Sequence, residues 1–338
     1  MAQKRSLFVY LFIAFFNLQT CTLAFAQKVT FEKIELPAEL KTINVLRIEN
    51  SKILWIASGN GLFKMDNGKI EGFLDVPDNK KLGVNTLEID QYGNKWLGTY
   101  YGELLKFKNG KIVTAVNFSE YLDPDNSIVT SIAVNDDSSR NESKILLTTS
   151  DGQIFYYDTL THKKGKIASP VKDMIYSINY GFGKTMWLST HEGFYTKKTG
   201  NHWKQKLDLY LSYGIFKSHN KYWALGRDQS KKAVFMLYYD HDGTTGKRYV
   251  WKEFQLKKLP NKYIRFYEVG FTSDSYAWIT SDSGLIRYNP LSGNVKVYNQ
   301  KKNKDFEIKT TRHIAVQDKN TMWISSSGRS LFKLRIKY

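Results

Sequence analysis

Histidines are the residues of this 338-residue chain with the clearest potential for catalysis. They show neither a metal-binding spacing such as H-x-x-x-H nor a carboxylate paired with them in sequence; they are His162, His191, His202, His219, His241 and His313. His191, in a predicted turn, and His313, near the start of a predicted strand, are the best placed to act as a general base. Asp240-His241-Asp242-Gly243 resembles a calcium loop, but Thr244 and Thr245 break the pattern, so it is better explained as a hairpin turn. We expect no catalytic residue, no metal and no cofactor.

Motifs of other enzyme classes are also missing from the sequence. It contains no Gly-rich phosphate loop and no nucleophile elbow, and the segment from Ser273 to Trp278 lacks the central Gly of a sialidase Asp box. A lyase remains the enzyme alternative, acting on polysaccharide or ester substrates; such an enzyme needs a base and usually a metal or a cationic group against the carboxylate or ester of its substrate.

Basic and aromatic residues give a better argument for binding. They lie in the connections that are predicted to surround one face of the fold, and the candidate ligand-binding residues are Tyr100, Tyr101, His191, Tyr210, Arg227, Lys262, Arg265 and Arg312. Tyr rings stack on sugar faces, while Arg holds a carboxylate or sulfate through paired hydrogen bonds. Acidic residues on the same rim weaken its positive field; they are Asp123, Asp125, Asp305 and Glu307.

One phrase recurs seven times and predicts the elements that position these residues. A Trp, an aliphatic residue, a small residue and Ser or Thr lead into a Gly turn and a second strand, as in W-I-A-S-G-N-G-L from Trp55 and W-I-T-S-D-S-G-L from Trp278. The copies begin at Trp55, Trp96, Leu146, Trp187, Trp223, Trp278 and Trp323. A strand precedes each copy and another follows it, so the sequence predicts a seven-bladed β-propeller of four-stranded antiparallel blades. The repeated Trp is expected to pack between blades rather than to bind sugar.

The two ends of the repeat array predict how the ring closes. The last copy ends with the strand from Leu331 to Lys337, which leaves no residues for a fourth strand, and an unassigned strand from Val29 to Leu36 precedes the first copy. We therefore expect the N-terminal strand to complete the last blade, which removes the open edges of a linear array.

The first 26 residues have the features of a signal peptide. Lys4 and Arg5 precede the apolar run Leu7 to Phe16, and Ala24-Phe25-Ala26 matches a small-x-small cleavage site. We expect an exported protein, periplasmic or secreted, with residues 27–338 as a single propeller domain that has no membrane-spanning segment and is a monomer. The only cysteine, Cys21, lies in the segment to be removed, so no disulfide is expected. The formal net charge is +18, of which +16 remains after cleavage, and it favours anionic partners of the envelope over nucleic acid.

The segment D-Q-Y-G-N-K-W-L-G-T-Y-Y-G-E-L, from Asp90 to Leu104, resembles the two-component regulator propeller repeat. The other copies match with decreasing fidelity, and together they cover nearly all of residues 27–338. The resemblance implies the periplasmic sensor half of hybrid histidine kinases, where two tandem propellers often report glycan breakdown products. This sequence contains one ring in place of two, without the Ig-like and kinase parts, so we expect fold and binding ancestry but no kinase signalling.

Together these observations predict a non-catalytic binding or interaction propeller. The first ligand expected is an acidic glycan or another anionic envelope polymer. A protein-docking scaffold, or a sensor accessory of an envelope complex, is the alternative, and a propeller lyase comes third.

Overall fold

The computed structural model describes residues 28–337 with internal gaps, and the statements below concern the described residues. The segments outside the description are residues 76–81, 123–127, 136–143, 182–184, 199, 208, 210, 219–220, 229, 231, 241–248, 258, 260–263, 273–275, 291, 302–307 and 328. The expected signal peptide, residues 1–26, also lies outside the described residues.

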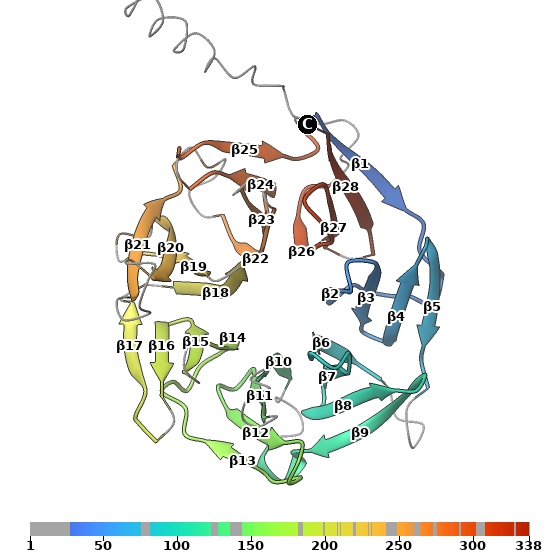
Figure 1. Cartoon of the computed structure of the whole chain (residues 1–338), viewed down its shortest axis with the longest axis vertical. Coiled ribbons are helices and arrows are strands. Elements are labelled where there is room, and N and C mark those ends of the chain that lie inside the picture. Colours follow the sequence, from blue (N-terminus) through green and yellow to red (C-terminus); the bar gives the residue numbers. More distant parts are fainter. Residues whose placement is uncertain are drawn as a thin grey trace, which may run out of the picture.

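The described strands form seven four-stranded sheets arranged around a central axis (Figure 1). Going outward from the axis, the first three are β2 (Val45–Glu49), β3 (Ile53–Ser58), β4 (Gly61–Asp66) and β5 (Lys69–Phe73); β6 (Val84–Ile89), β7 (Lys95–Thr99), β8 (Glu103–Lys108) and β9 (Lys111–Asn117); and β10 (Val129–Val134), β11 (Lys144–Thr149), β12 (Ile154–Asp158) and β13 (Lys164–Ile167). A short 3-10 helix, η2 (Ser119–Tyr121), follows β9.

The remaining sheets continue in chain order around the ring. They are β14 (Ile175–Tyr180), β15 (Met186–Thr190), β16 (Gly193–Lys197) and β17 (Lys204–Leu207); β18 (Leu211–Ser218), β19 (Lys221–Arg227), β20 (Ala233–Asp240) and β21 (Tyr249–Gln255); β22 (Phe266–Phe271), β23 (Ala277–Ser281), β24 (Gly284–Tyr288) and β25 (Val295–Tyr298); and β26 (Thr311–Val316), β27 (Thr321–Ser326), β28 (Leu331–Lys337) and β1 (Lys28–Ile34). The prediction of an all-β propeller built from four-stranded antiparallel blades is confirmed. Within the described residues, no helix is long and apolar enough to span a membrane.

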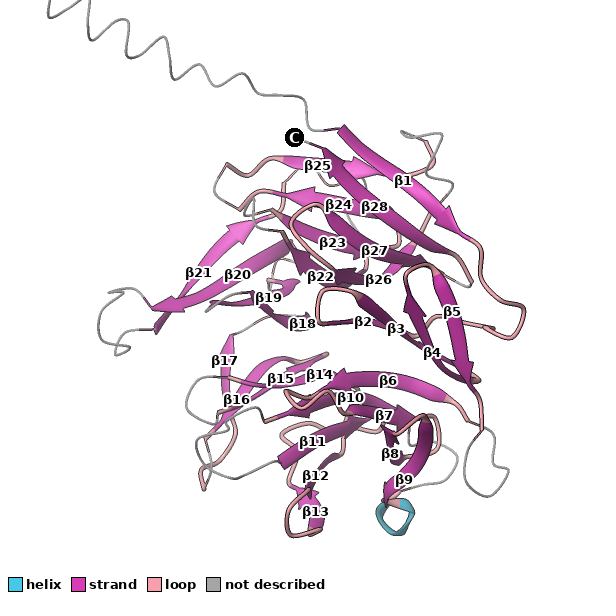
Figure 2. Cartoon of the chain, turned by 45° about the vertical axis from the view of Figure 1, so that its right-hand side comes forward, coloured by secondary structure: helices cyan, strands magenta, loops and turns pink. Residues whose placement is uncertain are grey.

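Strand β1 closes the ring, as the sequence predicts. It pairs antiparallel with β28 over its whole length, from Lys28 opposite Lys337 to Ile34 opposite Leu331, and Figure 2 shows the two strands lying side by side. The side chain of Phe31 also meets the Tyr298 ring of the preceding sheet edge-on, with ring centroids 5.7 Å apart. The closing strand is therefore held both by backbone pairing and by packing against its neighbour.

The repeated Trp side chains are core residues, which confirms their predicted role. Their exposed fractions are between 0% and 8%, for Trp55, Trp96, Trp187, Trp223, Trp278 and Trp323. Trp55 illustrates the packing, because its ring meets Phe107 of the next sheet edge-on at 5.2 Å. Its indole N–H donates to Glu49 Oε2 at 2.7 Å, so the one polar atom of the ring is satisfied within the sheet that carries it.

Four of the five glycines in the turns of the repeated phrase have a left-handed backbone conformation. Gly102, Gly152, Gly193 and Gly284 have positive φ angles between 74° and 124°. Gly61 does not have a positive φ angle. Glycine fits there for a steric reason, because a Cβ atom at this position would lie 2.5 Å from Leu74 Cδ2. The Asn67-Gly68 turn has φ values of 49° and 83°, the left-handed pair that a tight hairpin requires.

Phe31→Ala tests how much ring closure contributes to stability. Phe31 is partly buried and packs on Tyr298 at the closing sheet, so its removal should lower the free energy of unfolding by about 1–3 kcal/mol. Val113→Ala is the matched control, because Val113 also lies on an outer strand but is 40% exposed. Equal unfolding midpoints for the two variants in urea would contradict a stabilising role for the β1 packing.

Candidate ligand-binding site

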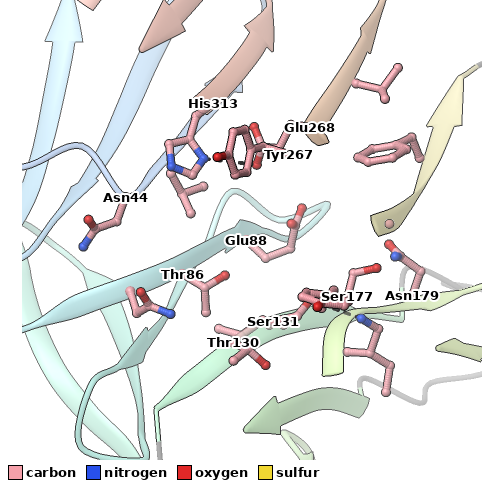
Figure 3. A pocket seen from close by; sticks show the side chains of 18 of the residues that line it. Asn44, Thr86, Glu88, Thr130, Ser131, Ser177, Asn179, Tyr267, Glu268 and His313 are labelled. Atoms are coloured by element: carbon pink, nitrogen blue, oxygen red, sulfur yellow. Dashed lines mark hydrogen bonds and ion pairs between the residues drawn. The ribbon is translucent and has the colours of Figure 1, made fainter. Parts of the chain in front are cut away.

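A cavity of about 850 Å³ occupies the central channel (Figure 3). The inner strands of all seven sheets contribute to its lining, namely β2, β6, β10, β14, β18, β22 and β26. The wall is thus continuous around the propeller axis. A ligand reaches this cavity along the axis and not from the side.

A register shift near the start of the inner strands aims consecutive polar residues into the cavity. It occurs in six of the seven inner strands, between residues 84 and 86, 129 and 131, 175 and 177, 212 and 214, 266 and 269, and 311 and 314. Such a bulge lets neighbouring residues face the same way, which a regular strand forbids. Tyr176 and Ser177 both line the cavity for this reason, and so do Thr130 and Ser131.

The cavity has a mouth and a deeper layer. Tyr176 and Asn179 both line it from β14 and are three residues apart, which corresponds to about 10 Å along a strand. The same interval separates Asn85 from Glu88 on β6. The first residue of each pair lies toward the face on which the inner strands begin, and the second lies deeper.

Cationic and aromatic side chains surround the mouth. The exposed side chain of Arg265 lines the cavity just before β22. His191 Nδ1 lies 3.5 Å from the Tyr176 hydroxyl, and both of these residues also line the cavity. The Arg312 guanidinium stacks over the ring of Tyr267, another lining residue, at 4.1 Å from its centroid. An anionic ligand at the mouth would meet Arg265, the imidazole of His191 and the rings of Tyr176 and Tyr267, with Arg312 packed on Tyr267.

A charged cluster spans the deeper part of the channel. Arg47 Nε on β2 lies 3.2 Å from Glu88 Oε2 on β6, and Arg47 Nη1 lies 3.7 Å from Glu268 Oε1 on β22. His313 Nδ1 on β26 lies 3.4 Å from the same Glu268 oxygen, an ionic contact without hydrogen-bond geometry. These four side chains are each between 21% and 33% exposed, so they present surface to the cavity while they bridge four sheets.

The cluster shifts the pKa values of its two central members. Burial on its own would raise the pKa of Glu268, but the neighbouring imidazole of His313, the guanidinium of Arg47 and the N–H of Ile314, which donates at 2.9 Å, outweigh it and lower the pKa. For Arg47, burial acts to lower the pKa, and the carboxylates of Glu88 and Glu268 raise it above its usual value. Both groups therefore stay ionised at neutral pH.

The opposite wall carries neutral hydroxyls and amides. Its lining residues are Thr86, Thr130, Ser131, Ser177 and Asn179. Ser131 Oγ already accepts the backbone N–H of Ile178 at 3.2 Å. Ser177 Oγ is buried and has no hydrogen-bond partner among the described residues. A buried hydroxyl without a partner costs free energy, so this oxygen is available to a ligand.

This arrangement suits a polar organic ligand better than a metal ion. No group of three or more His, Cys, Asp or Glu side chains that could hold a metal ion occurs within the described parts of the chain. The arginines and His191 can hold an anionic group. The carboxylates can accept hydrogen bonds from sugar hydroxyls, and the Ser and Thr hydroxyls can both donate and accept them. The tyrosines can stack on a sugar ring.

The structure brings some of the sequence-predicted site residues together and separates others. His191 and Arg265 line the cavity, and Arg312 packs on a lining residue. The half-buried Tyr100 supports the lining, because its hydroxyl accepts from Asn44 Nδ2 at 3.0 Å, and burial raises its pKa. Tyr101 is 51% exposed on the adjacent turn.

Three predicted site residues have a different outcome. Arg227 does not lie on an exposed rim, because it is only 7% exposed and its guanidinium donates to the carbonyl of Ile264 at 2.5 Å. It fixes the connection into β22, so its role is structural. Tyr210 and Lys262 lie outside the described residues.

Arg47, Glu88 and Glu268 are site residues that the sequence prediction missed, whereas it did single out His313. A usable signal existed in the repeat. Arg47 and Glu88 each lie opposite the Trp of the adjacent strand, at a position occupied by Ala315 in β26. A charged residue at an inner-strand position where another copy of the repeat has a small residue indicates a side chain that faces the central channel.

Comparisons with known proteins agree on the fold. No protein-family model matches the sequence, and no curated protein matches it. Virginiamycin B lyase from Staphylococcus aureus superposes with a TM-score of 0.69 at 15% identity, over 91% of this chain and 99% of the lyase. The extracellular domain of a hybrid two-component system from B. thetaiotaomicron has a TM-score of 0.67 at 13% identity, over 91% of this chain and 42% of that one. YCF48 from Cyanidioschyzon merolae has a TM-score of 0.63 at 10% identity, over 90% and 98%. At these identities the likeness establishes the propeller fold alone.

Glu268→Gln tests the charged cluster through its pH dependence. The pKa of Glu268 lies below its ordinary value of 4.5, so the carboxylate stabilises the folded state above that pH, and this contribution is lost as pH falls through the folded pKa. The variant should lose about 1–3 kcal/mol of unfolding free energy at neutral pH, and its difference from wild type should shrink as the pH falls below 4.5 and through the lowered folded pKa. Urea unfolding at several pH values measures this, with Glu71→Gln on the exposed edge of β5 as control. A difference that does not change with pH would contradict the ionic role.

Proposed function

We propose that this chain is an exported seven-bladed propeller that binds an acidic glycan, or another anionic component of the cell envelope, at the mouth of its central channel. The observation that carries the proposal is the convergence of Arg265, His191 and the ring of Tyr267 on one polar cavity. The protein acts by binding and not by catalysis, and it works as a monomer.

The chemistry of the mouth favours an anionic sugar over other anions. Arg265 is exposed, and its backbone is fixed because its carbonyl accepts the N–H of Asp282 at 3.1 Å. The guanidinium of Arg312 lies over the ring of Tyr267, 4.1 Å from its centroid, a cation–π contact that fixes its position beside the cavity. Tyr176 adds a second ring at the same level. Guanidinium groups next to aromatic rings match a sugar ring that carries a carboxylate or sulfate.

The N-terminal sequence supports export, and the net charge of +18 supports an anionic partner. The resemblance of the repeats to two-component regulator propellers supports a binding ancestry. The extracellular domains of two hybrid two-component systems from B. thetaiotaomicron share the fold, with TM-scores of 0.66 and 0.67, which is consistent with a propeller that works outside the cytoplasm.

One observation favours a lyase as the second candidate. His313 and Glu268 form an acid–base pair within the same cavity, where an imidazole oriented by a carboxylate could remove a proton from a ligand. One solved lyase of this fold is catalytically inactive when a single histidine is replaced by alanine. Binding remains the first proposal because the imidazole of His313 is engaged with Glu268, which also holds Arg47 and the N–H of Ile314.

Replacing Arg265 and Arg312 together by alanine tests the proposed function. Each guanidinium supplies charge-assisted hydrogen bonds, so the double variant should bind acidic oligosaccharides at least about tenfold more weakly, with an unchanged unfolding midpoint. The measurement is a glycan-array screen followed by calorimetric titration of the strongest ligand at low and moderate salt. Lys52→Ala with Lys319→Ala removes the same charge from exposed turns at the opposite ends of inner strands and should leave binding intact. Undiminished binding by the arginine variant would refute the proposal.

Incubation of wild type with the ligands found in that screen tests catalysis. We expect the oligosaccharides to be recovered intact, because the mouth is arranged for binding. Chain shortening by wild type that disappears in His313→Gln would replace the binding proposal with the lyase. Mass spectrometry of the recovered oligosaccharides distinguishes the two outcomes.

A further inference from the structure

We propose that the cavity receives one end of an oligosaccharide, with a neutral sugar unit in the deep layer against Glu88 and the acidic unit outside it at the mouth. This inference rests on the proposed function and adds to it the direction of binding and a residue that sets specificity.

The shape of the site requires end-on entry. Because residues from all seven inner strands line the cavity, no open side exists through which an internal segment of a long polymer could enter. A volume of about 850 Å³ lies within the range of small-ligand sites, about 300–1,000 Å³, and suits a few sugar units. A polymer would therefore be recognised only at a chain end.

The charge of the site reverses between mouth and interior. Arg265 and His191 line the mouth, and Arg312 lies over the ring of Tyr267, which lines it as well. Deeper in the cavity, the guanidinium of Arg47 lies 3.2 Å from the carboxylate of Glu88 and 3.7 Å from that of Glu268, and the imidazole of His313 lies 3.4 Å from the same Glu268 carboxylate. When that imidazole is neutral, the two carboxylates outnumber the one guanidinium. A carboxylate or sulfate on the ligand is attracted at the mouth and repelled in the interior. The acidic unit must stay outside.

Glu88 is the deep group best placed to select the inner unit. Arg47 holds its Oε2, and no described group pairs with its other carboxylate oxygen, Oε1. Figure 3 shows Glu88 projecting from β6 toward the middle of the cavity, between Glu268 and Ser177. Since a carboxylate can only accept hydrogen bonds, it selects a ligand with hydroxyl donors.

The facing wall complements this carboxylate. Ser177 Oγ is buried without a described partner between the mouth and the deep layer, and Asn179 lines the deep layer on the same strand. A hydroxyl can donate and accept, and an amide can do both as well, so a ring with several hydroxyl groups satisfies all three side chains at once. A neutral sugar unit has these groups on every side of its ring.

The test compares ligands that differ only in the neutral end. The probes are 3′-sialyllactose, lactose sulfate and a glucuronic-acid-substituted xylotriose, each beside its acidic unit alone and beside acid-only oligomers of the same length. Calorimetric titration of wild type should give at least about tenfold tighter binding for probes with a neutral end, since several hydrogen bonds to charged or buried groups are added.

Glu88→Gln keeps the size of the side chain and removes its charge. It should weaken binding of the neutral-ended probes at least about tenfold and, because repulsion is relieved, strengthen binding of the acid-only oligomers. A merely structural role for Glu88 would weaken both classes alike. Glu71→Gln, on the exposed outer strand β5, is the matched control and should change neither.

The outcomes separate this inference from the proposed function. If acid-only oligomers bind wild type as tightly as neutral-ended probes, and Glu88→Gln changes nothing, end-on recognition is wrong while anionic binding stands. If none of the probes binds wild type, both proposals fall. If the selective loss and gain described for Glu88→Gln are observed, the inference is supported.

Discussion

Pairing between β1 and β28 brings the two ends of the chain into one sheet, and the position of the binding cavity depends on that pairing. Without it, the seven sheets would form a row with two exposed edges, and the inner strands would not enclose a channel. The contact between Arg47 on β2 and Glu268 on β22 makes the dependence concrete. The closing sheet lies between the sheets that carry these residues, so the contact exists only in the closed ring.

Scaffold and site use different positions of the same repeat. The Trp strands are buried on both faces and pack sheet against sheet, which keeps the repeat uniform. The inner-strand position opposite the Trp varies instead, from Arg47 and Glu88 to Asn179, Gly270 and Ala315. Gly270 and Ala315 pack against neighbouring side chains at this level, whereas Arg47, Glu88 and Asn179 line the cavity. The channel is therefore asymmetric although its frame is repetitive, and an asymmetric wall is what distinguishes one end of a ligand from the other.

Features that depend on neighbouring residues could be predicted from the sequence, and features that depend on contacts between distant residues could not. The strands, the hairpin at Asn67-Gly68 and the closing strand were predictable, because period-2 patterning, turn chemistry and the unequal ends of the repeat array are local or counting signals. The burial of Arg227 was not predictable, because its guanidinium donates to the carbonyl of Ile264, a residue 37 positions later in the sequence. The cluster of Arg47 with Glu268 joins residues more than 200 positions apart, and no spacing rule relates them.

The overall charge of the protein and the charge at the site must be considered separately. A net charge of +18 acts over distances of about 10 Å at moderate salt, so it raises the local concentration of anionic ligands without choosing among them. In the binding mode proposed above, selection would occur inside the channel, where the carboxylates of Glu88 and Glu268 oppose a negative charge. In that mode, a surface that attracts anions and an interior that excludes them would orient a ligand whose charge is confined to one end. This combination explains why composition alone points to an anionic partner but does not identify which part of that partner enters the protein.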